Sequence, residues 1–262
     1  MSTGPKDPSH LDLDQDLDPT RTAHTLREQW YRGAMRSFVW VVLAFALSAA
    51  GMAWAFRESL AGSPLFVATI LGTEGILAAV FVLRASRDGE LSAWLRPKWG
   101  DFTGGALTAA ALFGATYVLG RVLVPEGSGR QLWLMRLYLQ LGSTDVLRQK
   151  AWLAASVIVL FAIVDALAWR GLVPSLLAER VGSRRAWMWA ALLYGLSYAP
   201  AAYLVGDKVN GPNLLLVSGA LVTGIILGAS TRFFGRLIPG VIAHSLFAWF
   251  SLMTYRLMTP SV

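Results

Sequence analysis

Several long apolar runs limit what this chain can fold into more than any other feature of its sequence. A helix needs roughly 20 apolar residues to cross about 30 Å of hydrocarbon, and several windows reach that length. Lipid offers no hydrogen-bond partners to bare backbone groups, so a spanning segment must satisfy them internally, as a helix does. Hydrophobic residues make up 55% of the chain and charged residues 15%, a composition too apolar for a soluble globular domain. The sequence therefore predicts an all-α, polytopic transmembrane helical bundle.

The pattern of apolar runs predicts about seven spans, and six to eight are compatible with it. Pro200 is expected to kink or end the fifth span, because proline removes a backbone donor. Residues 130–142 mix basic and apolar residues at helical spacing but are too short to span, so we predict an interfacial helix there. Ala220, Gly224 and Gly228 recur every four residues, which lets a neighbouring helix approach closely. The predicted spans are 36–56, 63–83, 104–124, 149–170, 186–205, 213–231 and 238–258.

The chain divides into three parts. Residues 1–34 are polar, acidic and then basic, and are predicted to be a disordered tail. Residues 35–144 hold the N-terminal spans and the interfacial helix, and residues 145–258 form a core bundle. With a cytoplasmic N-terminus, the inner segments carry thirteen Lys and Arg residues and the outer segments eight. The positive-inside rule therefore favours this orientation.

The formal net charge of +7 is better explained by topology than by a nucleic-acid partner. The basic residues flank the apolar spans, and no basic patch interleaves with a soluble fold. We therefore expect membrane lipids as partners and no nucleic acid. The chain has no cysteine, which excludes disulfides, a thiol nucleophile and cysteine-bound zinc.

Few ionisable residues remain inside the spans: Glu74, Asp165, Arg170 and His244. A charge at mid-membrane costs about 2.5–3.5 kcal/mol on insertion scales, so such residues either pin helices together or mark a functional site. Five helical residues advance about 500°, which predicts that Asp165 and Arg170 point some 140° apart and pair poorly. Arg170 is then expected to find an acceptor elsewhere, and Glu74 is one candidate.

Three segments in the second half of the chain carry a recognisable pattern. They are D-A-L-A-W-R-G at Asp165–Gly171, Y-G-L-S-Y at Tyr194–Tyr198 and H-S-L-F-A at His244–Ala248. Together they resemble the CPBP family of intramembrane proteases, which includes the type II CAAX prenyl endopeptidases and bacteriocin-immunity-associated membrane proteins. The resemblance covers roughly residues 145–258.

The resemblance implies hydrolysis of peptide bonds by a carboxylate-activated water, with preorganised donors at the oxyanion. It makes Asp165, Arg170, Tyr198 and His244 the candidate catalytic residues. In this reading Asp165 activates water, His244 and Tyr198 support the oxyanion, and Arg170 holds the helix. No cofactor is expected, and one histidine with one aspartate is too small a ligand set for a zinc site.

The segments also depart from the family pattern at four positions. Asp165 stands where the family has a glutamate, Ala166 replaces a second glutamate, Tyr198 replaces a histidine and Ala248 replaces an asparagine. Two functions therefore remain open: a divergent intramembrane endopeptidase acting on a membrane-embedded peptide or protein, or a catalytically degenerate member that binds membrane segments or partners. An unrelated membrane transport or scaffold subunit is the alternative. Analogy with the family suggests a bacterial cytoplasmic membrane, and the oligomeric state is open.

Overall fold

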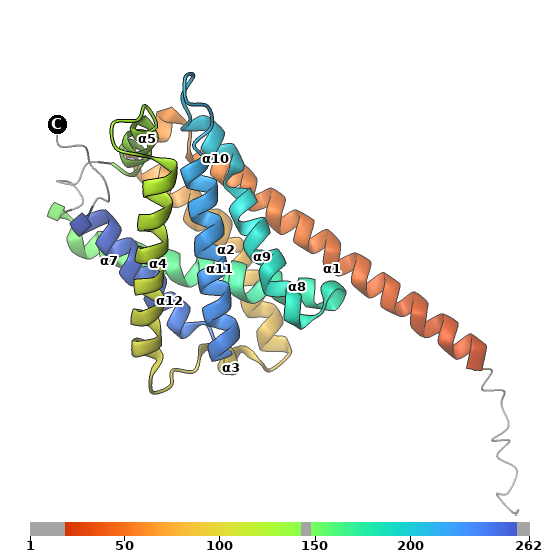
Figure 1. Ribbon diagram of the computed structural model, residues 1–262. Coiled ribbons are helices and arrows are strands. Elements are labelled where there is room, and N and C mark those ends of the chain that lie inside the picture. The colour runs from red at the N-terminus through yellow and green to blue at the C-terminus, as the bar shows by residue number, and fades with distance from the viewer. Residues whose placement is uncertain (1–18, 143–147, 256–262) are drawn as a thin grey trace, which may run out of the picture.

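The computed structural model describes residues 19–142 and 148–255, which are helical apart from loops and one isolated β-bridge between Asp207 and Gly211. Figure 1 shows the helices packed into one bundle, from which the N-terminal part of the first helix extends. The elements are α1 (Pro19–Ala55), η1 (Glu58–Leu60), α2 (Pro64–Arg87), α3 (Leu91–Leu95), α4 (Asp101–Leu123), α5 (Gln131–Leu141), α7 (Ala151–Ala166), η2 (Leu167–Leu172), α8 (Val173–Val181), α9 (Ser183–Ser197), α10 (Ala199–Leu204), α11 (Leu214–Phe234), α12 (Ile238–Phe250) and η3 (Ser251–Tyr255).

Within the described ranges, five helical segments are long and apolar enough to cross a membrane. This confirms the predicted class, a polytopic helical membrane bundle. The fifth and seventh predicted spans correspond to shorter helices, α9 with α10 and α12 with η3. The five long segments are Ser37–Ala55, Pro64–Arg87, Asp101–Leu123, Ala151–Val181 and Leu214–Phe234.

The fifth predicted span is interrupted where the proline predicts it. Helix α9 ends at Ser197, and α10 begins at Ala199 with Pro200 in its first turn. Proline fits this position because the backbone N–H there has no intrahelical partner in any case. The interruption leaves Tyr198 at the junction of the two helices.

Two predictions for the first half of the chain, the polar tail and the interfacial helix, are met in part. Residues 1–18 of the predicted tail lie outside the described residues, and helix α1 begins at Pro19, within that tail. The predicted helix at 130–142 is confirmed as α5, and Gln140 donates to the Ala55 carbonyl at the end of α1 over 2.9 Å. The location of α5 at a membrane interface stays a prediction.

The fourth predicted span is one continuous helical segment that crosses the bundle behind α4, α12 and α11 (Figure 1). It runs through α7, η2 and α8 and contains 31 residues. Its central part, η2, is π-helical, and all six of its residues are buried. Gly171 allows this part to lie against α2, because a Cβ atom there would sit 2.8 Å from the ring of Phe81.

Small residues bring α11 against α9, as their four-residue spacing predicts. A Cβ atom at Gly224 would lie 3.2 Å from the Cα atom of Ala191, and one at Gly228 would lie 3.2 Å from the ring of Trp187. The two helices therefore touch backbone to backbone along this face, which confirms the predicted close approach. The contact fixes the position of α9 and of the tyrosines it carries.

We predict that Gly195→Ala destabilises the protein. A methyl group at this position of α9 would lie 2.8 Å from Cβ and 3.0 Å from Cα of Leu221 in α11, so the helices would have to separate. Overpacking of this kind costs about 1–3 kcal/mol, and each kcal/mol lowers the Tm of a chain of this size by about 2–4 °C. The measurement is the Tm of the detergent-solubilised protein. Gly219→Ala is the control, since a Cβ atom there meets nothing within 4 Å. Equal Tm values for both variants would contradict the prediction.

Candidate active site

The three motif segments meet in the interior of the bundle. Asp165 and Arg170 come from α7 and η2, Tyr194 from α9, and His244 from the middle of α12. All four are buried, with Asp165 only 1% and Arg170 only 4% exposed. Helices that are far apart in the sequence thus supply one shared polar cluster.

Asp165 and Arg170 form a buried ion pair, and our prediction that they pair poorly is wrong. Nη1 of Arg170 donates to Oδ2 of Asp165 within the same helical segment. The reason is the π-helical geometry of Leu167–Leu172, in which hydrogen bonds join residues i and i+5. The wider turn brings residues five apart closer to one face than the 140° separation expected of a regular α-helix. No feature of the sequence indicated this local widening.

His244 completes the cluster from a different helix. Its Nδ1 atom lies 3.1 Å from Oδ2 of Asp165, the same oxygen that Arg170 contacts. The ring of Phe161 packs edge-on against the imidazole, with 5.4 Å between the ring centroids. The carboxylate therefore lies close to one imidazole nitrogen, although within the described ranges Nδ1 makes no hydrogen bond of regular geometry.

Two tyrosines continue the cluster on the other side. The hydroxyl groups of Tyr194 and Tyr198 are 3.1 Å apart, as residues four apart on one helical face allow. The guanidinium carbon of Arg170 lies 4.6 Å from the centre of the Tyr194 ring, within the range of a cation–π contact. Arg170 thereby links the carboxylate to the tyrosine pair.

Glu74 is buried in α2 but is not the acceptor for Arg170. Its Oε1 atom accepts a hydrogen bond of 2.6 Å from Ser48 of α1. The expected acceptor across the bundle was therefore the wrong one, because the π-helical turn gives Arg170 a nearer carboxylate in Asp165. Glu74 instead ties α1 to α2.

A cavity of about 280 Å³ opens beside the cluster, between α4, α5, α9, α11 and α12. His244, Tyr194 and Tyr198 line it, whereas Asp165 does not and lies behind His244. Of the candidate catalytic residues, Tyr198 and His244 thus share this cavity wall, whereas Asp165 reaches it only through His244. Most of the other lining residues are apolar, and hydroxyl groups on other sides come from Thr116, Tyr117, Tyr138, Thr223 and Ser251.

A second, more apolar cavity of about 300 Å³ adjoins the first. Tyr198 and Phe161 lie in the wall of both, and Ala248 lines the second one only. The fourth residue of the H-x-x-x-A segment therefore contributes a methyl group to an apolar space and offers no hydrogen-bond donor there.

The cluster has the parts for acid–base chemistry. A carboxylate that lies close to one nitrogen of an imidazole helps to orient the ring. The other nitrogen can then take a proton from water and return it, and nearby hydroxyls can donate to an oxyanion. Among the residues that the structure describes, no group of three or more His, Cys, Asp or Glu side chains is arranged to hold a metal ion.

Comparison with known families agrees with this arrangement. Residues 147–250 match the family model described as type II CAAX prenyl endopeptidase Rce1-like. We call these residues the Rce1-like domain, after the family model that they match. The match confirms the resemblance drawn from the three motif segments. No curated protein and no solved structure matches the chain significantly.

The Rce1-like domain contains α7 to α12, and with them Asp165, Arg170, Tyr198 and His244. Glu74 and Ser48 lie outside it, on the N-terminal helices that close the cluster from the α2 side. The N-terminal helices thus pack against the Rce1-like domain, and the family match does not include them.

Some residues of the site were not predicted from the sequence. Tyr194 begins the second motif segment, and its position four residues before Tyr198 was a usable signal for a shared face. Phe161 and Ser48 carried no signal, because a phenylalanine and a serine in apolar runs do not reveal which neighbours they meet. Only the packing of α12 on α7 and of α1 on α2 assigns them.

We predict strong energetic coupling between Asp165 and Arg170. Asp165→Asn leaves a buried guanidinium without its counter-charge, which costs about 3–5 kcal/mol. Adding Arg170→Gln removes that charge, so the double variant should lose about 0.5–3 kcal/mol less than the sum of the single variants. The measurement is a double-mutant cycle of unfolding free energies in detergent.

The control for this cycle is the pair Arg84–Glu179, whose side chains are 39% and 38% exposed. Solvent-exposed ion pairs contribute about 0–1 kcal/mol, so Arg84→Gln should have a small effect. Additive losses for Asp165 and Arg170 would show that the two residues do not stabilise each other.

Proposed function

We propose that this protein is an intramembrane endopeptidase in which His244 acts as the general base. The observation that carries the proposal is the 3.1 Å approach of His244 Nδ1 to Asp165 Oδ2 at the wall of a cavity inside the bundle. The Rce1-like domain supports a protein of the CAAX-protease type in a membrane. The substrate we propose is a peptide or protein segment that enters the bundle from the membrane.

The resemblance assigns the activation of water to Asp165. The geometry favours His244 for that role, with Asp165 supporting the imidazole. Asp165 is enclosed by Arg170 and His244 and does not line the cavity, so it is poorly placed to touch water there. His244 does line the cavity. In the proposed step, a water attacks the scissile carbonyl carbon while Nε2 of His244 takes its proton, and Asp165 stabilises the imidazolium.

The remaining groups take supporting roles. The hydroxyls of Tyr194 and Tyr198 donate to the oxyanion of the tetrahedral intermediate. His244 then returns its proton to the leaving amine as the C–N bond breaks, which releases a carboxylic acid and an amine. Arg170 positions Asp165 and does not contact the substrate. The step uses no cofactor.

The same reasoning extends to location. We propose that the protein lies in a bacterial cytoplasmic membrane with a cytoplasmic N-terminus. The support is the excess of Lys and Arg in the segments assigned to the inner side, together with analogy to the family.

The endopeptidase is tested with His244→Gln, which keeps a neutral polar side chain in the same space. Loss of a general base should lower cleavage of a membrane-peptide library by about 10²–10⁴-fold. Tyr198→Phe should lower it less severely, because Tyr194 still supplies a hydroxyl. Cleavage is measured by mass spectrometry with purified protein in liposomes, and far-UV circular dichroism verifies that each variant folds. Cleavage by His244→Gln at the natural rate would remove His244 from the mechanism.

The second candidate is a catalytically degenerate member that binds membrane segments without cutting them. The observation that favours it is Ala248, which faces an apolar cavity where the family pattern has an asparagine. Loss of a single oxyanion donor can reduce turnover by about 10²–10³-fold. A protein that only binds membrane segments would keep the apolar cavities and lose only the cleavage reaction.

A restored family pattern separates the two candidates. The variant carries Asp165→Glu, Ala166→Glu, Tyr198→His and Ala248→Asn. If the natural chain is degenerate, it should cut nothing in the library while the restored variant does. Cleavage by the natural chain at a rate within about tenfold of the variant would exclude degeneracy.

A further inference from the structure

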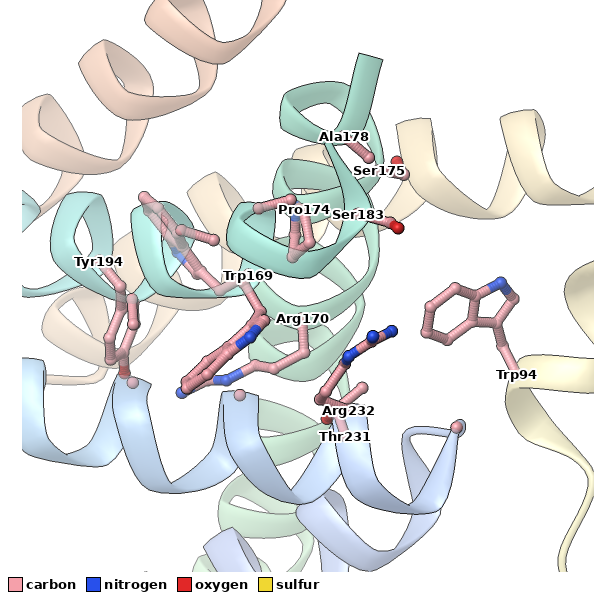
Figure 2. Close-up of a pocket in the computed structure, with 17 residues that line it drawn as sticks. Trp94, Trp169, Arg170, Pro174, Ser175, Ala178, Ser183, Tyr194, Thr231 and Arg232 are labelled. Atoms are coloured by element: carbon pink, nitrogen blue, oxygen red, sulfur yellow. The ribbon is translucent and has the colours of Figure 1, made fainter. Parts of the chain in front are cut away.

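A further cavity, separate from the two that Tyr198 lines, lies on the opposite side of Tyr194 from the proposed active site. Its volume is about 240 Å³, and α8, α9 and α11 enclose it, with Trp94 of α3 at its edge. Tyr194 lines both cavities and so stands between them. Figure 2 shows Arg232 reaching into this space between Ser183 and Trp94, with Arg170 deeper inside, near Tyr194.

The charges in this cavity are all positive. Arg170 and Arg232 are its only ionisable lining residues apart from Tyr194, and no aspartate or glutamate lines it. In the part of the chain that the structure describes, Arg232 makes no hydrogen bond or ion pair. Arg232 is exposed, so its charge can reach an anion that enters the mouth of the cavity without first breaking a contact within the protein.

The buried groups point to the same kind of partner. Arg170 is 96% buried, and while its Nη1 contacts Asp165, its Nη2 has no hydrogen-bond partner within the described ranges. The hydroxyl of Thr231, 92% buried, also lacks a partner there. A buried donor without a partner is costly, and more so when it is charged. A ligand rich in acceptor oxygens would satisfy both.

The size and shape of the cavity further limit which ligands can bind in it. One water takes about 30 Å³ of liquid, so the space exceeds what a bare phosphate fills and has room for several more atoms. Trp187 and Trp94 supply flat apolar walls for that remainder. Two guanidinium groups at different depths suit a tetrahedral anion with three terminal oxygens.

We propose that this cavity binds a phosphomonoester or a related phosphate-type anion, held between Arg232 and the free nitrogen of Arg170, with Thr231 donating to it. The anion is either the headgroup of a membrane lipid or a free phosphate compound, which share this chemistry. The proposal does not depend on peptide hydrolysis, because the cavity is separate from the one that His244 lines. It gives Arg170 a second role, since the guanidinium would bind Asp165 on one edge and the anion on the other.

The test uses the purified full chain in phosphate-free neutral detergent. In one arm, inorganic phosphate is titrated and intrinsic tryptophan fluorescence is recorded, because three tryptophans line the cavity. In the other arm, the protein is placed in phosphatidylcholine nanodiscs with or without phosphatidic acid, and retained lipid is measured by native mass spectrometry. Arg232→Gln should weaken binding about 10- to 100-fold in whichever arm shows it.

Matched variants make the outcome decisive. Arg185→Gln removes the same charge from an exposed position at the start of α9 that does not line the cavity, and it should leave binding unchanged. Thr231→Val removes one hydroxyl at nearly constant volume and should weaken binding severalfold. Phosphate binding that depends on Arg232 assigns a free phosphate compound, and lipid retention alone that depends on it assigns a headgroup. Binding in neither arm, or an equal loss in Arg185→Gln and Arg232→Gln, would overturn the proposal.

Discussion

The ion pair between Asp165 and Arg170 is the interaction on which the rest of the structure depends. Both groups are almost fully buried in a segment that is otherwise apolar, where either charge alone is strongly unfavourable. The π-helical turn between them lets each neutralise the other without help from another helix. Wide turns of this kind are rare and commonly occur at functional sites, which fits a turn that carries the polar centre of the bundle.

Around this pair, the neighbouring helices are arranged by small residues and a proline. Glycines on α11 allow α9 to lie against it, and the interruption near Pro200 places Tyr198 at the end of α9. The packing of α12 on α7 then brings His244 to the carboxylate oxygen that Arg170 also contacts. Polar residues that are tens of positions apart thus meet because apolar and small surfaces elsewhere on the same helices fit together.

The two polar cavities explain why Arg170 and Tyr194 are both central. One cavity presents an imidazole and two phenols among apolar walls, which suits a peptide segment. In the other, the charged lining residues are two arginines, and hydroxyl groups lie beside them among apolar walls, which suits an anion with an apolar part. Arg170 contacts the carboxylate behind the first cavity and opens onto the second, so a ligand in the second would alter the field at Asp165. The two proposals are therefore physically adjacent while remaining separately testable.

The sequence by itself determined the class, the helical break at Pro200, the close approach of a helix to the face with Gly224 and Gly228, and the motif segments that resemble the family. These follow from local properties: apolar run length, the missing donor of proline, small-residue spacing and motif order. Only the tertiary structure decided that Arg170 pairs with Asp165, that Glu74 bonds to Ser48 and that Asp165 lies behind His244. The physical reason is that helical rotation is set by packing. One wide turn changes which side chains share a face, and regular helical spacing does not reveal it.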